Sequence, residues 1–354
     1  MSDSTIKVAV VGVGNLTSAL VQGIEYYKEN QTRELLWPKM GGFSIPDIHV
    51  VAAFDVDDRK VGKDLGEAIF APPNNQRGVV SDFPKTGVIV SKAPMMDGGS
   101  EYTHDILKES SEKDANVVDV LKSTGAEILV LNTPSGADQV IQYFTEAAYE
   151  AGVAVINCTP SPVVRDANWV KKFKDKHLPL IGDDLQSQAG GTVFHKGVLE
   201  ILNEQAVVVE NTYQLDVSGG LEGLTTLDFE RRSLKRSTKE DSIKRSLPYD
   251  IKVAAGTTDY LDFLGSRRIG HYWIFGKSFL GQDVKIDIRM EVDDSNGAAS
   301  LVDAIRSTKI ALRRGTSGPV PSICAHLFKA PPVNMARRDA NQAFSEYIQG
   351  ERNQ

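Results

Sequence analysis

The first half of the chain alternates short apolar runs with longer amphipathic stretches. The runs cover residues 6–12, 49–54, 88–90, 128–131, 153–156 and 178–181. Runs of this length, rich in β-branched residues, are typical of strands buried on both faces, and a stretch such as 137–151 has helical spacing. Strands that alternate with helices predict an α/β fold with a parallel, doubly wound sheet.

The second half has a different pattern. Beyond about residue 202, apolar and polar residues alternate along 207–217 and again along 284–292. This alternation indicates a mostly antiparallel sheet with one buried face, which could also join the subunits of an oligomer. From Pro319 a strand-like apolar run (SICAHLF) follows, and a closing helix is expected near 337–347. We therefore expect two domains: 1–185 with 320–354 returning to it, and an α+β domain at 186–319.

Composition narrows the class of protein. The chain is 41% hydrophobic and 25% charged, and its formal net charge of −7 disfavours nucleic acids and anionic membranes as partners. Its two cysteines, Cys158 and Cys324, offer neither a disulfide framework nor metal-ligand spacing. No apolar run approaches the roughly 18 residues that span a bilayer. We expect a cytoplasmic protein that acts on a small molecule.

A glycine-rich turn follows the first predicted strand and reads GVGNLTSA at residues 12–19. Gly12 would allow the tight turn and Gly14 the close approach of a pyrophosphate, while Asn15 and Leu16 open the next helix. The third glycine of this motif normally lets the helix pack closely on the strand, and small residues at 17–19 replace it here. A turn of this kind between a strand and a helix predicts a dinucleotide-binding Rossmann domain.

Asp55 ends the second predicted strand, where an acidic residue usually contacts the ribose of the dinucleotide. The spacing from Gly14 exceeds the usual value of about 20 residues. An inserted loop at 26–47, which contains two glycines and two prolines, accounts for the excess. A carboxylate at this position would repel a 2′-phosphate, which favours NAD over NADP. The alternative is an exposed aspartate at a strand end.

Polar turns follow other predicted strands and contribute Asp97, Thr133, Ser135 and Asn157. These turns belong to the edge of the sheet where doubly wound folds bind ligands. We expect the four side chains to line the cofactor site, although plain surface turns would have a similar composition.

The stretch 180–196 (LIGDDLQSQAGGTVFHK) joins the two predicted domains. An apolar run ends in a turn that contains Asp183 and Asp184, which we expect to contact the cofactor, and small and polar residues then open an expected helix. A helix N-terminus presents backbone N–H groups to an anion, so the stretch predicts a phosphorylated substrate beside a nicotinamide. In the alternative interpretation the two aspartates cap the helix, and Ser187 and Gln188 are solvated.

A lysine-rich segment at 231–245 holds seven basic and two acidic residues in an otherwise acidic protein. Lys235 and Lys239 are four residues apart and would share a helix face, at a cost of a few tenths of a kcal/mol, roughly. They form either a solvated basic face or a site that neutralises a phosphate and an oxyanion. Lys329 is a separate lysine that precedes a Pro-Pro turn.

Taken together and in this order, these motifs resemble the inositol-1-phosphate synthase family, in its shorter bacterial and archaeal form. The resemblance runs from residue 6 to about 332. The segments VAVVGVGNLTSALVQGIEYY and VAAFDVD resemble its cofactor-binding half, and GDDLQSQAGGT resembles its GDD-x-x-S-x segment. It implies that Ser187 and Gln188 hold the substrate phosphate and that the active-site residues include Lys235, Lys239, Lys329, Glu222 and Asp294.

Two positions depart from the family pattern. A further active-site lysine, in a D-x-K-x-A type segment, is replaced by Arg268 within residues 266–270. The family's GGN, after a QLNV-like strand, reads Ser218-Gly219-Gly220 here and therefore lacks an asparagine side chain. These changes leave open a shifted substrate, a retuned mechanism or a loss of activity.

The resemblance also implies a reaction. NAD⁺ oxidises C5 of open-chain glucose 6-phosphate, C6 loses a proton, the enolate closes a ring on the C1 aldehyde, and the hydride returns, which yields 1L-myo-inositol 1-phosphate. Lys239 would serve either the phosphate or the C5 oxygen. A homotetramer is expected, and a divalent or monovalent cation requirement is left open. Three alternatives remain: an NAD-dependent dehydrogenase, a cyclase of another sugar phosphate, and a cofactor-sensing regulatory protein.

Overall fold

A seven-stranded parallel sheet forms the body of the molecule. The computed structural model describes residues 5–354. All neighbouring strand pairs of this sheet are parallel, and the central β1 lies between β4 and β2. From one edge to the other the strands are β11 (Gly318–Pro319), β6 (Pro179–Ile181), β5 (Ala154–Asn157), β4 (Ile128–Leu131), β1 (Ile6–Val11), β2 (Ile48–Asp55) and β3 (Val90–Lys92). The order 3-2-1-4-5-6 is that of a dinucleotide-binding doubly wound fold, as the sequence predicts.

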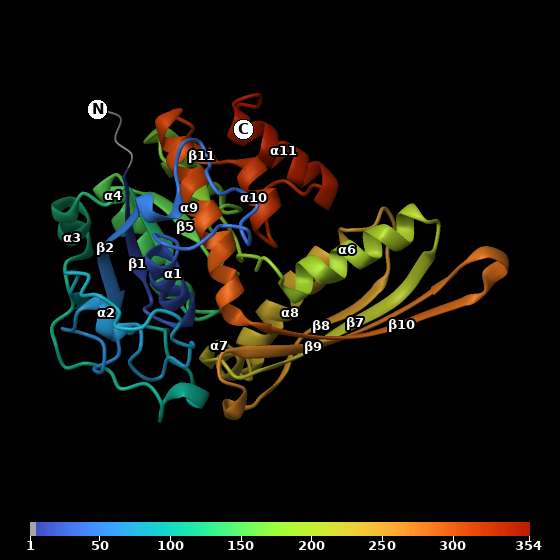
Figure 1. The fold of residues 1–354 in the computed structure, drawn as a ribbon, viewed down its shortest axis with the longest axis horizontal. Coiled ribbons are helices and arrows are strands. Elements are labelled where there is room, and N and C mark those ends of the chain that lie inside the picture. Colours follow the sequence, from blue (N-terminus) through green and yellow to red (C-terminus); the bar gives the residue numbers. More distant parts are fainter. Residues whose placement is uncertain (1–4) are drawn as a thin grey trace.

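Helices cover both faces of this sheet, and a separate hydrophobic core lies on each side (Figure 1). In β1, Ile6, Val8 and Val10 enter one core and Ala9 and Val11 the other, which explains why the strand is apolar except at the exposed Lys7. One face carries α1 (Asn15–Tyr26), α9 (Gly297–Arg313), α10 (Pro321–Leu327) and α11 (Arg337–Gln349). The other carries α3 (Val117–Thr124), α4 (Asp138–Ala151) and α5 (Ala167–Asp175), and the short α2 (Leu65–Ala68) follows β2.

Two local predictions are wrong. The third strand is β3, two residues later than expected: of residues 88–90 only Val90 is fully buried, Val88 is partly buried and Ile89 is 56% exposed. The run at 322–328, expected as a strand, forms helix α10 instead. Pro321 begins that helix, where its fixed φ is favourable and its missing N–H costs nothing. Burial on most sides of this helix makes its sequence as apolar as a strand.

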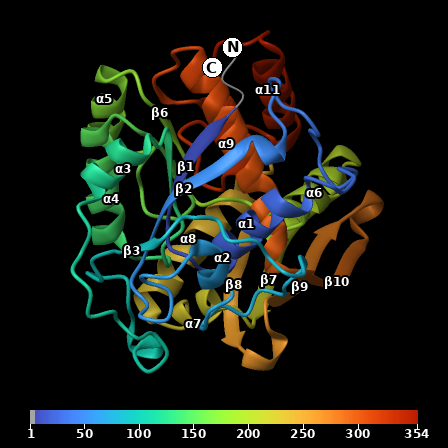
Figure 2. The same ribbon diagram turned by 60° about the vertical axis from the view of Figure 1, so that its left-hand side comes forward.

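The second sheet has four strands in the order β10–β9–β7–β8. Its β7–β9 and β9–β10 pairs are antiparallel and its β7–β8 pair is parallel, so the sheet is mixed but mostly antiparallel. Helices α6 and α8 pack against this sheet, and α7 lies at one end of it (Figure 2). The bounds are β7 (Val208–Ser218), β8 (Lys252–Tyr260), β9 (Arg267–Lys277), β10 (Asp283–Asp293), α6 (Gly191–Glu204), α7 (Leu221–Thr225) and α8 (Phe229–Lys244).

The buried face of β7 is not the one that the apolar pattern suggests. A register shift between Val209 and Asn211 reverses the phase of the strand. Beyond it the polar side chains are buried and Leu215 is 38% exposed. The inward residues are Thr212, Gln214, Asp216 and Ser218. The second sheet therefore presents a polar surface to the junction with the first.

Helix α9 returns to the first sheet before residue 320. Its residues Leu301 and Ile305 belong to the same core as β1, and β11 pairs with β6. We still propose two domains, 1–185 with 320–354 and 186–319. The packing of α9, however, shows that the chain rejoins the first sheet near Gly297, before residue 320.

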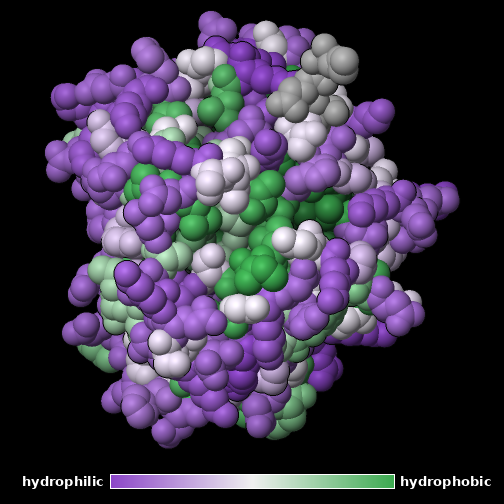
Figure 3. All heavy atoms as spheres, turned by 90° about the vertical axis from the view of Figure 1, so that its left-hand side faces the viewer, coloured by the Kyte–Doolittle hydropathy of each residue, from purple (hydrophilic) through white to green (hydrophobic). Residues whose placement is uncertain are grey.

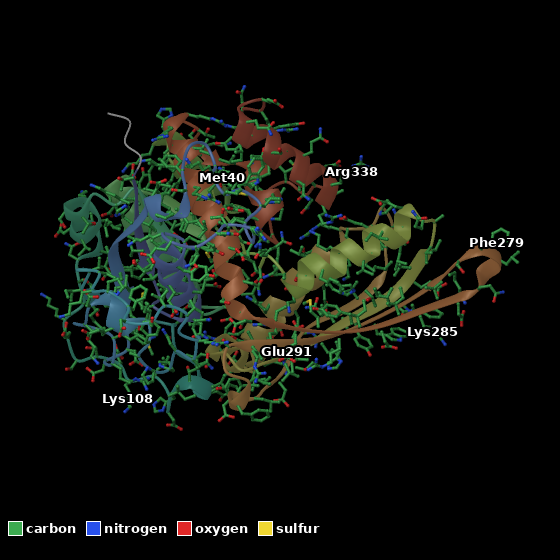
Figure 4. The ribbon with its side chains drawn as sticks, viewed as in Figure 1. Met40, Lys108, Phe279, Lys285, Glu291 and Arg338 are labelled. Atoms are coloured by element: carbon green, nitrogen blue, oxygen red, sulfur yellow. The ribbon has the colours of Figure 1, made fainter. Side chains whose placement is uncertain are left out.

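The second sheet extends away from the body as a long arm, and the β9–β10 turn forms its tip (Figure 4). Phe279 lies at that tip with 86% of its side chain exposed. The face of the molecule on the side of the first sheet is largely hydrophilic, with apolar side chains gathered near its middle (Figure 3). No helix within residues 5–354 is long and apolar enough to cross a membrane.

Candidate active site

A cavity of about 350 Å³ lies at the junction of the two sheets. It begins at the carboxyl ends of β1 and β4, where the strand order reverses, and continues to the polar face of β7. Most of the sequence-predicted site residues line it. They are Gly12, Gly14, Asn15, Leu16, Asp55, Thr133, Ser135, Asp184, Ser187, Glu222, Lys235, Lys239, Arg268, Asp294 and Lys329.

The glycine-rich turn lies at one end of this cavity. Gly12 has a φ of +89°, and a Cβ there would come within 2.6 Å of the Asn132 carbonyl oxygen on the β4 side. Glycine is therefore required both by the backbone and by the close approach of the two loops. Gly14 precedes the first residue of α1 and has open space where a Cβ would stand. Thr17 Oγ1 donates to the Gly12 carbonyl at 2.6 Å, which holds the turn against the helix.

Asp55 ends β2 beside this turn and is 9% exposed. Its carboxylate accepts hydrogen bonds from the backbone N–H groups of Val13, at 2.7 Å, and of Val56 and Asp57. Lys60 Nζ lies 3.7 Å away and also donates to the Val13 carbonyl. Asp55 therefore holds the glycine turn in place and lies at the cavity wall.

The loop at 182–190 forms the middle of the cavity wall. Asp184 is 1% exposed, and its Oδ1 accepts from Lys329 at 2.7 Å and from Lys235 at 3.4 Å. Its Oδ2 is buried and has no hydrogen-bond partner within the described chain. The loop ends at Gly190, and α6 begins only at Gly191, so the two aspartates do not cap that helix. The helix was expected to begin earlier, near Ser187.

Helix α8 brings its two lysines to the cavity, and each contacts a carboxylate. Lys235 Nζ lies 3.3 Å from Glu222 Oε1 and donates to Ser135 Oγ at 3.1 Å. Ser135 in turn donates to Glu222 at 2.5 Å. Lys239, one turn further on, donates to Asp216 of β7. The lysine-rich segment is thus a site wall at these two positions and not a solvated face.

The two departures from the family pattern meet in one cluster. Arg268 Nε donates to Asp294 Oδ1 at 3.2 Å, and its Nη1 lies 4.0 Å from Asp216 Oδ2. A Cβ on Gly220 would stand 3.4 Å from Asp294 Oδ2. Both departures therefore change the surroundings of the same carboxylate, Asp294.

The three lysines differ in proton affinity. Burial lowers the pKa of Lys329 to about 8, and Asp184 opposes this only in part. Burial also lowers the pKa of Lys239. Burial acts on Lys235 too, but Asp184 and Glu222 outweigh it and raise its pKa. A pKa of about 8 makes Lys329 suited to gain and lose a proton near neutral pH.

Four predicted residues lie outside the cavity lining. Asp97 accepts from the backbone N–H groups at the start of α4, at 2.8 and 3.1 Å. Asn157 and Asp183 are buried and hydrogen-bonded to each other at 2.8 Å, behind the loop. Gln188 is exposed and donates to the Glu34 carbonyl. These contacts stabilise the surrounding structure, and none of the four side chains lines the cavity.

Sequence reasoning missed Asp216, Gln214 and Lys60. Asp216 and Gln214 line the cavity from β7, and the expected phase of that strand assigned its odd-numbered residues to the buried face. Four polar residues at alternate positions, 212 to 218, are the signal that could have identified them. Lys60 follows β2 and carries no motif of its own.

The fold and the cavity define a doubly wound α/β protein. Its dinucleotide-type turn lies in the same cavity as a group of paired lysine, arginine and carboxylate side chains.

A sequence profile described as myo-inositol-1-phosphate synthase matches residues 190–295. The inositol-3-phosphate synthase of Mycolicibacterium smegmatis is 36% identical, with 98% of each chain covered, and that of Corynebacterium glutamicum is 34% identical, with 98% of this chain and 99% of the relative covered. A myo-inositol-1-phosphate synthase-related protein from Thermotoga maritima has the same fold, with a TM-score of 0.80 at 23% identity and 98% of each chain covered.

The chain belongs to the myo-inositol-1-phosphate synthase family.

Proposed function

We propose that this protein converts glucose 6-phosphate into 1L-myo-inositol 1-phosphate by oxidation, enolisation, intramolecular aldol closure and re-reduction, without net redox change. Its family membership supports this activity. The observation that carries the proposal is that four cationic side chains, besides Lys60, line the same cavity as a dinucleotide-type glycine turn. These cations are Lys235, Lys239, Arg268 and Lys329.

The cofactor proposed for this site is NAD, and the end of the cavity near Gly12 fits it. Gly14 leaves room for a pyrophosphate at the start of α1, where backbone N–H groups favour an anion. The buried Asn132 Oδ1 and Thr133 Oγ1 have no partner among the described residues, which suits them to polar groups of a dinucleotide. NAD, when bound, supplies the reversible acceptance of a hydride from C5. Gly12, Gly14, Asn15, Leu16, Asp55 and Thr133 would hold it.

The phosphate of the substrate is proposed to lie at the N-terminus of α6. This 14-residue helix has no side chain that caps it, and Gly190, Gly191 and Thr192 line the cavity together with Ser187. Thr192 Oγ1 is buried without a partner within the described chain. Free backbone N–H groups and a hydroxyl suit a phosphate. Ser187 is proposed to contact the phosphate, as the family resemblance implies, whereas Gln188 is exposed and donates to the Glu34 carbonyl.

The cations have separate proposed roles in proton transfer and charge stabilisation. Lys329, with a pKa near 8, can accept the proton from the C5 hydroxyl or from C6 and return it later. Lys235 stays charged because its carboxylate partners raise its pKa, so it can stabilise the developing oxyanion. Arg268 supplies a permanent charge on the opposite wall. Asp184 holds Lys235 and Lys329 together through one oxygen atom.

The assembly is proposed to be a homotetramer. On the outer face of the second sheet Tyr213, Trp273 and Phe275 stack with ring centroids 5.8 and 5.9 Å apart. Strand β10 is an edge strand of 11 residues, and long unpaired edges favour pairing with another chain. Light scattering tests this: four times 38.6 kDa is expected, and a monomer at micromolar concentration would contradict it.

The sequence leaves open whether turnover requires a divalent or monovalent cation. Within residues 5–354 no group of three or more histidine, cysteine, aspartate or glutamate side chains could hold a metal ion. Activity after chelation, and in sodium against ammonium buffers, tests the requirement.

The activity itself is tested by mixing the protein with glucose 6-phosphate and a small amount of NAD⁺. The product is identified by chromatography against inositol phosphate standards, and fructose 6-phosphate serves as the alternative substrate. Cyclisation of glucose 6-phosphate supports the proposal. Turnover of only the second sugar would instead favour a cyclase of another sugar phosphate, as the changes at Gly220 and Arg268 allow.

A further inference from the structure

Asp216 is a cavity carboxylate that none of the sequence motifs identifies. It is 1% exposed and lies in the polar face of β7, at the inner wall of the cavity. Gln214 Nε2 donates to both of its oxygen atoms, at 3.1 and 3.0 Å. Its Oδ2 accepts from Lys239, and Arg268 Nη1 lies 4.0 Å away. The carboxylate therefore joins a cation of α8 to a cation of β9.

The neighbouring strand is built to leave room for this carboxylate. Asp216 lies opposite Gly270 in the register of β7 and β9. A Cβ on Gly270 would stand 3.0 Å from Asp216 Oδ1 and 2.7 Å from the Tyr272 hydroxyl. A larger residue at 270 would displace one of these groups. The position of Asp216 is therefore fixed by both strands.

The other charged side chains with the largest effect on Lys239 are cations. Arg268 faces it from β9, Lys235 precedes it by one turn on α8, and Lys329 contributes from the segment after α10. His195 faces this region from α6, and burial lowers its pKa to about 4, so it is neutral near pH 7. Asp216 is the carboxylate that opposes these charges at Lys239.

We propose that Asp216 is a positioning residue that keeps Lys239 charged and fixed against the inner wall, so that its ammonium group can stabilise anionic oxygen atoms of the substrate. This role rests on the proposed function for the reaction that it assists. The protonation of Lys239 is a property of the unliganded protein and can be measured without turnover.

The test is the near-isosteric variant Asp216→Asn, which keeps a hydrogen-bond acceptor and removes the charge. Acetylation of Lys239 as a function of pH, read by peptide mass spectrometry, reports its protonation directly. Because a carboxylate favours the ammonium form, its loss lowers the pKa of Lys239, and the labelling midpoint moves to lower pH. In Asp216→Asn the alkaline limb of the kcat profile should also move to lower pH. Lowering the pH should then restore kcat, and KM should change little.

Asp294→Asn is the matched control, because it removes the other carboxylate beside Arg268 but no partner of Lys239. It is expected to lower kcat and to leave the labelling midpoint of Lys239 in place. In the background of Lys239→Gln, which itself loses about 10²–10³ in kcat, Asp216→Asn should cost nothing further. Asp216→Glu keeps the charge but shifts it, so kcat falls while the labelling midpoint stays.

An unchanged labelling midpoint and alkaline limb in folded Asp216→Asn would overturn the proposal. If that variant does not fold, unchanged kcat in Asp216→Glu would overturn it. A labelling shift in a protein that forms no inositol phosphate would overturn the proposed function and leave the link between Asp216 and Lys239 intact.

Discussion

Asp184 and Lys329 are joined at both the side chain and the backbone. Lys329 Nζ donates to Asp184 Oδ1 at 2.7 Å, and the backbone N–H of Lys329 donates to the Asp184 carbonyl at 2.8 Å. The loop before α6 and the segment after α10 are 145 residues apart in sequence and meet through this pair. A lysine that is held at both ends keeps a fixed position while it changes protonation.

Lys329→Met should remove the proposed proton-transferring group. General acid–base groups typically contribute about 10²–10⁴-fold, so kcat should fall by a factor in that range. In the unmodified protein a base must be neutral to act, so kcat should fall as the pH drops below about 8, the pKa of Lys329. Steady-state rates between pH 6 and 9.5 test both statements.

Lys171→Met is the matched control for this variant, since the Lys171 side chain is 78% exposed and is not part of the cavity lining. It should leave the pH profile unchanged. A Lys329→Met protein that keeps full activity would assign proton transfer to another group.

Asp55→Ala should reduce the preference for NAD over NADP. The Asp55 carboxylate lies at the cavity wall, where a 2′-phosphate would meet its charge, although Lys60 at 3.7 Å offsets part of the repulsion. Calorimetry at fixed salt compares the two affinities. Equal affinities in the unmodified protein would remove Asp55 from the ribose site.

Arg268→Lys should stay active, whereas Arg268→Ala should lose about 10²–10³ in kcat with an unchanged circular dichroism spectrum. The reason is that a stabilising cation needs only its charge, and both side chains supply one near Asp294. If position 268 must transfer a proton, the unmodified protein will be slow and Arg268→Lys will accelerate it. Full activity in Arg268→Ala would place the residue outside the site.

Asp97→Ala should destabilise the fold without affecting cofactor affinity. Its carboxylate accepts from the first N–H groups of α4, and loss of such a cap costs about 1 kcal/mol. Thermal unfolding and NAD titration measure the two effects separately. A large loss of NAD affinity would restore the role that the sequence first suggested for Asp97.

The sequence predicted the first sheet well because its strands are apolar on both faces and its turns carry glycine and aspartate at fixed positions. Val8 and Val10 pack into one core while Ala9 and Val11 pack into the other, so the apolar run identifies β1 without knowledge of the tertiary structure. The glycine turn and Asp55 follow from the same local rules, and their places in the cavity agree with them.

The second sheet was harder to predict because its buried face is polar. The shift after Val209 moves Asp216 inward, and the apolar alternation along the strand, which continues through it, assigns the opposite face to the core. Helix α10 was mistaken for a strand because burial makes its residues apolar irrespective of backbone conformation. The separate roles of Lys235 and Lys329 depend on which carboxylates each one meets, and those partners come from distant segments.

The most direct test of the account is turnover with glucose 6-phosphate and NAD⁺ at a small fraction of the sugar concentration, followed by product analysis and NADH absorbance together. The account predicts inositol phosphate well in excess of the NAD⁺ supplied, with no steady accumulation of NADH, because the hydride is returned in each cycle. NADH formed in proportion to the sugar consumed, without a cyclised product, would contradict it and establish a dehydrogenase.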